Sequence, residues 1–132
     1  MKESKRYLAN VTLVVMDYDE AIDFYTQKLG FRLVEDINLG DGKRWVLVAP
    51  NDAQCNILLG KAVGAEQEAA IGNQTGGRVF LFLHTNNFWE DYNTMKEKGV
   101  IFKEEPRKES YGTVVVFEDL YGNLWDLLQL TS

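Results

Sequence analysis

The chain has 132 residues with one histidine, one cysteine, 14 basic and 20 acidic side chains. Zinc fingers, three-histidine zinc sites, iron–sulfur clusters and disulfide scaffolds each need several imidazoles or thiolates, so the composition excludes all of them within one chain. The formal net charge of -6 argues against nucleic acid and anionic membranes as partners, because phosphate binding requires clustered lysine and arginine. The length suits a single domain over residues 1–132.

The apolar stretches of the chain are short. Val11–Met16 and Val79–Leu83 fall far below the roughly 20 residues that cross a bilayer, so no membrane partner is expected. Residues 1–6 are charged and no long apolar run follows them, which argues against a secretory signal. A single cysteine, Cys55, is typical of proteins in a reducing compartment. We therefore expect a cytoplasmic protein.

The first half of the chain has the pattern of a strand, a helix and three strands. The β-branched and apolar run Val11–Met16 predicts a strand. Asp17 or Asp19 can cap a helix whose apolar side chains recur at helical spacing until Gly30. The strands expected next are Phe31–Leu39, Arg44–Ala49 and Cys55–Leu59. Residues 7–60 therefore form a first βαβββ module.

The same order returns after residues 61–77, a polar, small-residue stretch that we interpret as a linker. Arg78–Leu83 is an expected strand, and the apolar side chains of 88–95 line one side of a helix that ends at Gly99. Further strands are expected at Val100–Lys103, Thr113–Glu118 and Leu124–Leu130. Residues 78–130 thus form a second βαβββ module.

The two modules keep a nearly constant offset. Equivalent positions lie 68, 69 and 70 residues apart in the pairs Asn10/Arg78, Gly30/Gly99 and Asn56/Asp126. An offset that drifts by so little across a whole module indicates a duplicated unit. One helix cannot cover both faces of a four-stranded sheet, so one face of each module is left to enclose a ligand or to meet another module.

Four segments carry a resemblance to a known family: Asn10–Asp17, Ala21–Tyr25, Lys28–Phe31 and Asp119–Asp126. They resemble the vicinal oxygen chelate superfamily, which holds glyoxalase I, extradiol dioxygenases, fosfomycin-resistance transferases and bleomycin-resistance proteins. The resemblance covers about residues 7–130. It implies an α+β fold of two tandem βαβββ modules with concave mixed sheets. A bacterial protein that assembles as a homodimer is the corresponding expectation.

The enzymes of this superfamily bind one divalent metal through the first and last strands of each module. The resemblance places those positions at Asn10, Asn56, Arg78 and Asp126. Only Asp126 is an ordinary metal ligand, whereas the Arg78 guanidinium has no lone pair to donate and stays cationic. We therefore expect no cofactor, with a divalent metal as the less favoured alternative. His84 lies about 20 Å beyond Arg78 along an ideal strand and is expected to hydrogen-bond locally.

Strand alternation places other side chains on the same face as the former ligand positions. The predicted face consists of Asn10, Thr12, Val14, Asn56, Leu58, Arg78, Phe80, Phe82, Leu124, Asp126 and Leu128. Amides, aromatic rings, a cation and a carboxylate above apolar side chains are typical of a small-molecule pocket. Arg78 and Asp126 either pair with each other and fill the position that holds the metal in the enzymes, or they contact a ligand. In the second case Asp126 orients the ligand or accepts a proton from it.

Three aromatic residues add to this interpretation. Trp45 is expected at the rim of the concave surface of the sheets, which we call the cup. There it either stacks on a planar ligand or packs against its neighbours. Tyr111 precedes an expected strand in a loop that can fold over the cup in this family, and is a candidate lid residue. Trp125 faces away from Asp126 and is expected in the core.

The sequence leaves three functional hypotheses. The first is a metal-free, homodimeric cup that binds a small organic molecule. The predicted ligand-binding residues are Asn10, Thr12, Trp45, Asn56, Arg78, Phe80, Phe82, Tyr111 and Asp126. The alternative is a lyase or isomerase of the glyoxalase type, either metal-dependent or using Asp126 as general base. A third is that the dimer serves another protein. The acidic chain would attract a cation, but Arg78 would attract an anion.

Overall fold

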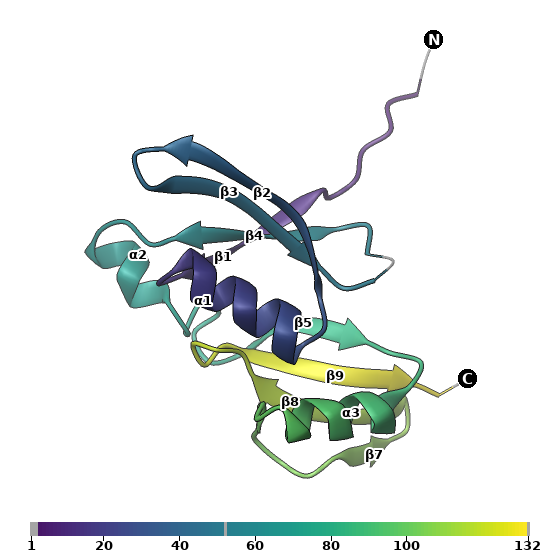
Figure 1. Ribbon diagram of the computed structural model, residues 1–132. Coiled ribbons are helices and arrows are strands. Elements are labelled where there is room, and N and C mark those ends of the chain that lie inside the picture. The colour runs from purple at the N-terminus through teal and green to yellow at the C-terminus, as the bar shows by residue number, and fades with distance from the viewer. Residues whose placement is uncertain (1–2, 52, 132) are drawn as a thin grey trace. The chain divides into compact units, whose positions relative to one another are not determined.

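The computed structural model describes residues 3–51 and 53–131, which form two compact units divided between Lys61 and Ala62 (Figure 1). Each unit combines a mixed sheet with helices, so the predicted α+β class is confirmed. No helix in these residues is long and apolar enough to span a membrane.

The first unit follows the predicted order. Its elements are β1 (Asn10–Val15), α1 (Tyr18–Asp23), a π-helical turn η1 (Phe24–Lys28), β2 (Arg32–Gly40), β3 (Lys43–Ala49) and β4 (Asn56–Lys61). The strands are ordered β1-β4-β3-β2, with β1 parallel to β4 and the other pairs antiparallel. Asp17 is the N-cap, because its carboxylate accepts a hydrogen bond from the Glu20 backbone N–H at 2.9 Å.

The core of the first unit lies between the sheet and α1, which contacts β3 and β4 (Figure 1). Leu13 and Val15 on β1 are fully buried, and so are Val46 and Val48 on β3. Because side chains alternate along a strand, the residues between them point to the other face of the sheet. The helix therefore covers one face only, as expected.

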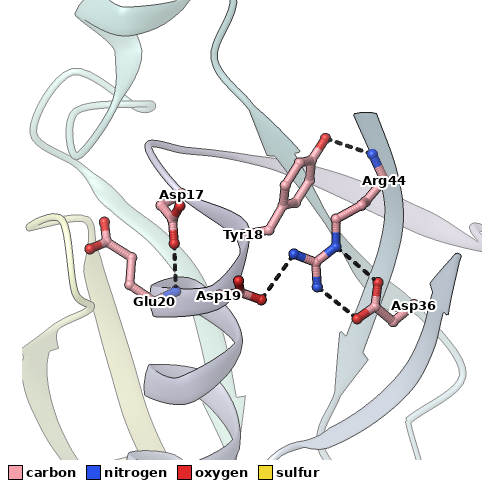
Figure 2. Close-up of polar contacts among 6 residues, drawn as sticks. All are labelled: Asp17, Tyr18, Asp19, Glu20, Asp36 and Arg44. Atoms are coloured by element: carbon pink, nitrogen blue, oxygen red, sulfur yellow. Dashed lines mark hydrogen bonds and ion pairs between the residues drawn. The ribbon is translucent and has the colours of Figure 1, made fainter. Parts of the chain in front are cut away.

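Arg44 joins the start of α1 to the hairpin of β2 and β3, as Figure 2 shows. Its guanidinium donates to Asp19 at 2.9 Å and to both carboxylate oxygens of Asp36 at 3.1 and 2.7 Å. It also lies 5.2 Å from the centre of the Tyr18 ring. The hydrogen bond from Arg44 holds the pKa of Asp36 below its usual range.

The second unit contains more elements than the sequence predicts. They are α2 (Ala65–Ala70), β5 (Val79–His84), α3 (Phe88–Glu97), β6 (Ile101–Phe102), β7 (Arg107–Glu109), β8 (Gly112–Glu118) and β9 (Leu124–Leu130). The strand order is β5-β9-β8-β6, with β7 also paired to β8. As in the first unit, the outer pair β5 and β9 is parallel and the remaining pairs are antiparallel.

Two of these elements depart from the expectations. The presumed linker 61–77 contains the helix α2, because Ala65–Ala70 consists of strong helix formers. This helix lacks an apolar stripe and buries none of its residues, so it leaves no periodic signal. The short strand β7 directly follows Pro106 and is formed by charged residues, which is why the sequence pattern does not predict it.

An aromatic chain forms the core of the second unit between the sheet and α3 (Figure 1). Trp125 is only 2% exposed and stacks on Phe117 with ring centres 5.8 Å apart. Phe102 contacts Phe117 at 6.1 Å and Tyr92 of α3 at 4.6 Å. The prediction that Trp125 lies in the core is confirmed. The face of the sheet that carries Asp126 is the opposite one.

Candidate functional site

The open face of the first sheet brings together three of the predicted site residues. The parallel pairing of β1 with β4 sets Asn10 opposite Asn56 and Thr12 opposite Leu58. Paired residues of neighbouring strands project to the same side, so the two amides and the Thr12 hydroxyl share a face. Asn10 and Thr12 are exposed and Asn56 is half-buried. This part of the predicted face is confirmed in its geometry.

Trp45 lies on the same open face. Leu47 pairs with Leu58, and Trp45 is two residues from Leu47 along β3. Its indole N–H donates to the Glu35 carboxylate at 3.3 Å, and its ring is half-buried. The hydrogen bond orients the ring on the sheet and leaves part of its surface accessible. Stacking on a ligand remains a prediction for Trp45.

In the second unit the register of β5 against β9 differs from the expectation. Arg78 lies just before β5, and the first paired residue, Val79, is opposite Leu124. Asp126 pairs instead with Phe82. No ion pair or hydrogen bond joins Arg78 to Asp126, although both residues are among those described. The alternative in which these two side chains pair and fill the family's metal position is therefore wrong.

β5 also has an irregularity between Val79 and Leu81, which accounts for one of the four residues that separate Arg78 from Phe82. An extra residue in one strand breaks the alternation of side chains, so a single count by two does not give the correct face on both sides of it. The Phe80 ring meets Trp125 edge-on with centres 6.4 Å apart. Phe80 thus packs on the α3 side and not beside Asp126, contrary to the expectation, whereas Phe82 does share the face of Asp126.

Asp126 is the least satisfied polar group of this open face. Its Oδ1 atom is buried and has no hydrogen-bond partner among the described residues. Burial raises the pKa of the Asp126 carboxyl above its ordinary value, the positive charge of Arg107 opposes that rise and the negative charge of Glu104 adds to it. A buried carboxylate oxygen without a donor is costly, and because the Asp126 side chain as a whole is only half-buried, its carboxyl group is accessible to a hydrogen-bond donor from outside the chain.

Arg107 and Glu104 complete the surroundings of Asp126, and sequence reasoning did not select either. The Arg107 Nε atom lies 3.0 Å from both Glu104 oxygens. Glu104 also accepts a hydrogen bond at 3.1 Å from the backbone N–H of Val116, the residue that pairs with Asp126. The sequence signal in this segment is the alternation of Glu and Arg around Pro106, which does not distinguish a binding site from a solvated loop.

Tyr111 belongs to the same cluster. A hydrogen bond with its side chain is one of the interactions that raise the pKa of Arg107, together with larger contributions from Glu104. Tyr111 precedes β8 and is exposed. The structure therefore brings the predicted lid residue into contact with the Arg107 side chain on the Asp126 face, and its closing over a ligand remains a prediction.

His84 ends β5 and is exposed. It pairs with Leu128, so it lies on the Asp126 face, one alternation beyond Phe82. Because the register is shifted, His84 is nearer to Asp126 than the count from Arg78 predicts. At the usual rise per residue, His84 is separated from Asp126 along the strand direction by about 7 Å, rather than by the roughly 20 Å expected.

The residues at the family's metal positions do not fit a divalent cation. Asn10 and Asn56 offer only neutral amide oxygens, Arg78 is a cation, and Asp126 pairs with a phenylalanine. No group of three or more histidine, cysteine, aspartate or glutamate side chains in residues 3–51 and 53–131 is arranged to hold a metal ion. We derive no chemical step from a metal.

A separate hollow of about 440 Å³ lies in the second unit between α3 and β6. Its lining consists of Tyr92, Lys96, Val100, Phe102, Lys103, Glu104 and Glu105. None of the residues predicted from the sequence to bind a ligand lines it. Glu104 alone connects this hollow with the surroundings of Asp126.

Curated relatives cover nearly the whole chain. An uncharacterized protein of Shewanella frigidimarina (strain NCIMB 400) is 56% identical over 130 residues, which are 97% of this chain and 96% of that protein. YurT of Bacillus subtilis (strain 168), also uncharacterized, is 34% identical over 122 residues, 89% of this chain and 94% of that protein.

Solved structures share the fold. UcmS2 is 33% identical with a TM-score of 0.82, covering 95% of this chain and 98% of that chain. TnmS3, described as an antibiotic binding protein from Streptomyces sp. CB03234, is 26% identical with a TM-score of 0.78, covering 98% and 100%. Residues 7–127 match the family model for the Glyoxalase/Bleomycin resistance protein/Dioxygenase superfamily. With two open-faced sheets of matching topology and relatives along its whole length, the chain belongs to this superfamily.

Proposed function

We propose that the protein binds a small organic molecule on the open faces of its sheets and does so without the family's metal. The observation that carries the proposal is the pairing of Asp126, whose Oδ1 atom is buried and unpartnered, with Phe82, whose side chain is 61% exposed. An accessible aromatic ring next to an unsatisfied polar atom is the usual composition of a ligand site. Similarity to the antibiotic binding protein TnmS3 supports the same function.

The open face of the first sheet supplies a second set of polar and aromatic groups for this purpose. Asn10, Thr12 and Asn56 offer amide and hydroxyl groups, and Trp45 offers a ring held by Glu35. Side chains of this kind fix the orientation of a ligand, while the ring gives contact area at a low cost in side-chain entropy.

We further propose that the protein assembles as a homodimer. Large apolar side chains are exposed in both units, among them Tyr7 (82%), Leu8 (77%) and Ile101 (59%). Apolar side chains left in water favour association, because burying them removes apolar surface from solvent. Native mass spectrometry checks this assembly, and a monomer at micromolar concentration would contradict it.

The test of the binding function is a ligand screen followed by amide NMR on labelled protein. Antibiotics and smaller aromatic compounds are screened by thermal shift, and binders are then titrated. Binding on the proposed face shifts the amide signals of Phe82, Val116 and Asp126, and Phe82→Ala weakens binding. Trp89→Ala is a matched control, since Trp89 is also a half-exposed aromatic ring but lies on α3. Binders that shift only α3 would contradict the proposal.

A second candidate function rests on Asp126 alone. A carboxyl whose pKa is raised by burial can act as a general base closer to neutral pH than an ordinary aspartate. An isomerase or lyase of the glyoxalase type would use it to remove a proton next to a carbonyl group. Proton exchange of hydroxyketones in D2O, followed by NMR, tests this activity. Catalysis unchanged in Asp126→Asn would remove the residue from the mechanism.

A further inference from the structure

We infer that the Asp126 face of the second unit selects ligands that carry a protonated amine on an apolar, aromatic body. The inference rests on the proposed binding function and adds the chemical class of the ligand. The ammonium group pairs with the carboxylate of the half-buried Asp126 side chain, whose Oδ1 atom has no donor among the described residues, and the apolar body lies on the exposed ring of Phe82.

The geometry of β5 and β9 brings these two contacts together. Phe82 and Asp126 are direct partners in a parallel pair, so their side chains leave the sheet side by side on one face. The Phe82 ring is accessible, whereas the Oδ1 atom is buried and lacks a donor from the described residues. A cation near an aromatic face is attracted by the ring, and a carboxylate beside it adds a charge-assisted hydrogen bond.

The charges around Asp126 favour a cation over an anion. Three carboxylates, those of Asp126, Glu104 and Glu109, surround the one guanidinium of Arg107. The Arg107 Nε atom is already occupied by both oxygens of Glu104 at 3.0 Å, and its Nη1 atom lies 3.7 Å from Glu109. Arg107 is therefore neutralised by its own neighbours, and the negative charge of Asp126 remains without a bonded counter-charge.

This arrangement also decides between the two ligand charges left open by the sequence. Arg78, the residue that would attract an anion, is exposed and lies before β5, four residues before Phe82, the residue that pairs with Asp126. It therefore does not contribute a positive charge at the Asp126 carboxylate. A neutral hydroxyl can donate a hydrogen bond to the Asp126 carboxylate, but it gains no attraction from the net negative surroundings.

Binding of a cation is coupled to the protonation of Asp126. The ammonium group stabilises the ionised carboxylate, so a carboxyl that is protonated in the free protein releases its proton on binding. As the pH falls through the raised pKa of Asp126, the carboxylate is lost and the amine binds more weakly. The other titratable groups on the Asp126 face are His84 on β5, Lys103 after β6, Glu104 before β7, Arg107 and Glu109 on β7, Tyr111 before β8 and Glu118 on β8.

The experiment compares three probes that share one aromatic body: tryptamine, tryptophol and indoleacetate. Each is titrated into the labelled full-length protein at low salt, and dissociation constants are taken from the amide shifts of Phe82, Val116 and Asp126. We expect tryptamine to bind at least tenfold more tightly than tryptophol, which corresponds to about 1.4 kcal/mol, and indoleacetate to bind least. Equal or tighter binding of tryptophol or indoleacetate overturns the inference, as does the absence of tryptamine binding.

Two variants separate the Asp126 contact from general electrostatic attraction. Asp126→Asn is expected to reduce tryptamine binding to the level of tryptophol and to leave tryptophol unchanged. Glu118→Gln removes the same charge from the same face, but Glu118 pairs with Lys103 at 2.9 Å and does not touch Asp126, so tryptamine binding should change less than twofold. An equal loss in both variants would overturn the role of Asp126.

The outcomes also distinguish this inference from the proposed function. If tryptophol and tryptamine bind on the Phe82 and Asp126 face with the same affinity, the face binds small molecules and the amine selectivity is refuted. If compounds from the antibiotic screen bind only elsewhere on the protein, or if none binds, the proposed binding function is refuted.

Discussion

Replacing Gly72 by alanine should be among the most damaging single changes outside the core. Gly72 adopts a φ of +75°, and a Cβ atom there would lie 1.9 Å from the Tyr121 carbonyl oxygen and 2.9 Å from its carbon. Both atoms are backbone, so they cannot rotate away. The turn they belong to carries the buried Asn123, whose side-chain oxygen accepts a hydrogen bond from the Gln74 N–H at 3.2 Å.

The expected cost has two parts. Placing alanine in the left-handed region costs about 1–2 kcal/mol. Separating the backbones of 72 and 121 strains the hydrogen bonds of the turn, in which Asp119 accepts from the backbone N–H of Asn123 at 3.0 Å. Each such buried bond is worth roughly 1 kcal/mol or more, so a total loss of about 3–5 kcal/mol is expected.

Gly76→Ala provides the matched control. Gly76 has a φ of +67°, close to that of Gly72, but a Cβ atom there meets nothing within 4 Å. Urea unfolding followed by circular dichroism gives the free energy of unfolding of both variants. We expect Gly76→Ala to lose about 1–2 kcal/mol only, from the backbone strain alone. Equal losses in the two variants would show that the approach of Gly72 to Tyr121 does not contribute, and would refute the reasoning.

Three further predictions concern the core and the charged groups. Phe117→Ala should lower the free energy of unfolding by about 3–5 kcal/mol in urea denaturation, because it removes the ring between Phe102 and Trp125. Asp126→Asn should raise the melting temperature at pH 7, because burial raises the pKa of this carboxyl in the folded state and the ionised carboxylate therefore destabilises the fold above that pKa; a lower melting temperature at pH 7 would contradict this. Arg44 lowers the pKa of Asp36 in the folded state, so the pair contributes stability above the pKa that this carboxyl has in the unfolded chain. That contribution is lost as the pH falls through the folded-state pKa, so Asp36→Asn should reduce the fall in melting temperature between neutral and acid pH.

The order of the elements in the first unit and the open face of its sheet could be predicted from residue types alone. β1 and β4 are regular strands, so counting by two from Asn10 and Asn56 gives the correct face for Thr12 and Leu58. The capping carboxylate of Asp17 and the buried position of Trp125 follow from the same local rules. Each of these features depends on a short stretch of chain or on one uninterrupted alternation.

The surroundings of Asp126 depended on contacts that local patterns do not contain. The irregularity in β5 interrupts the alternation at Phe80, which packs against Trp125, and the register of β5 against β9 gives Asp126 the partner Phe82 and not Arg78. Neither feature has a signature in residue type. Arg107 and Glu104 reach Asp126 only because β7 pairs with β8. The one-histidine, one-cysteine composition thus determined which sites this protein cannot build, while the pairing of strands decided which side chains share a face, because register is a property of two strands together.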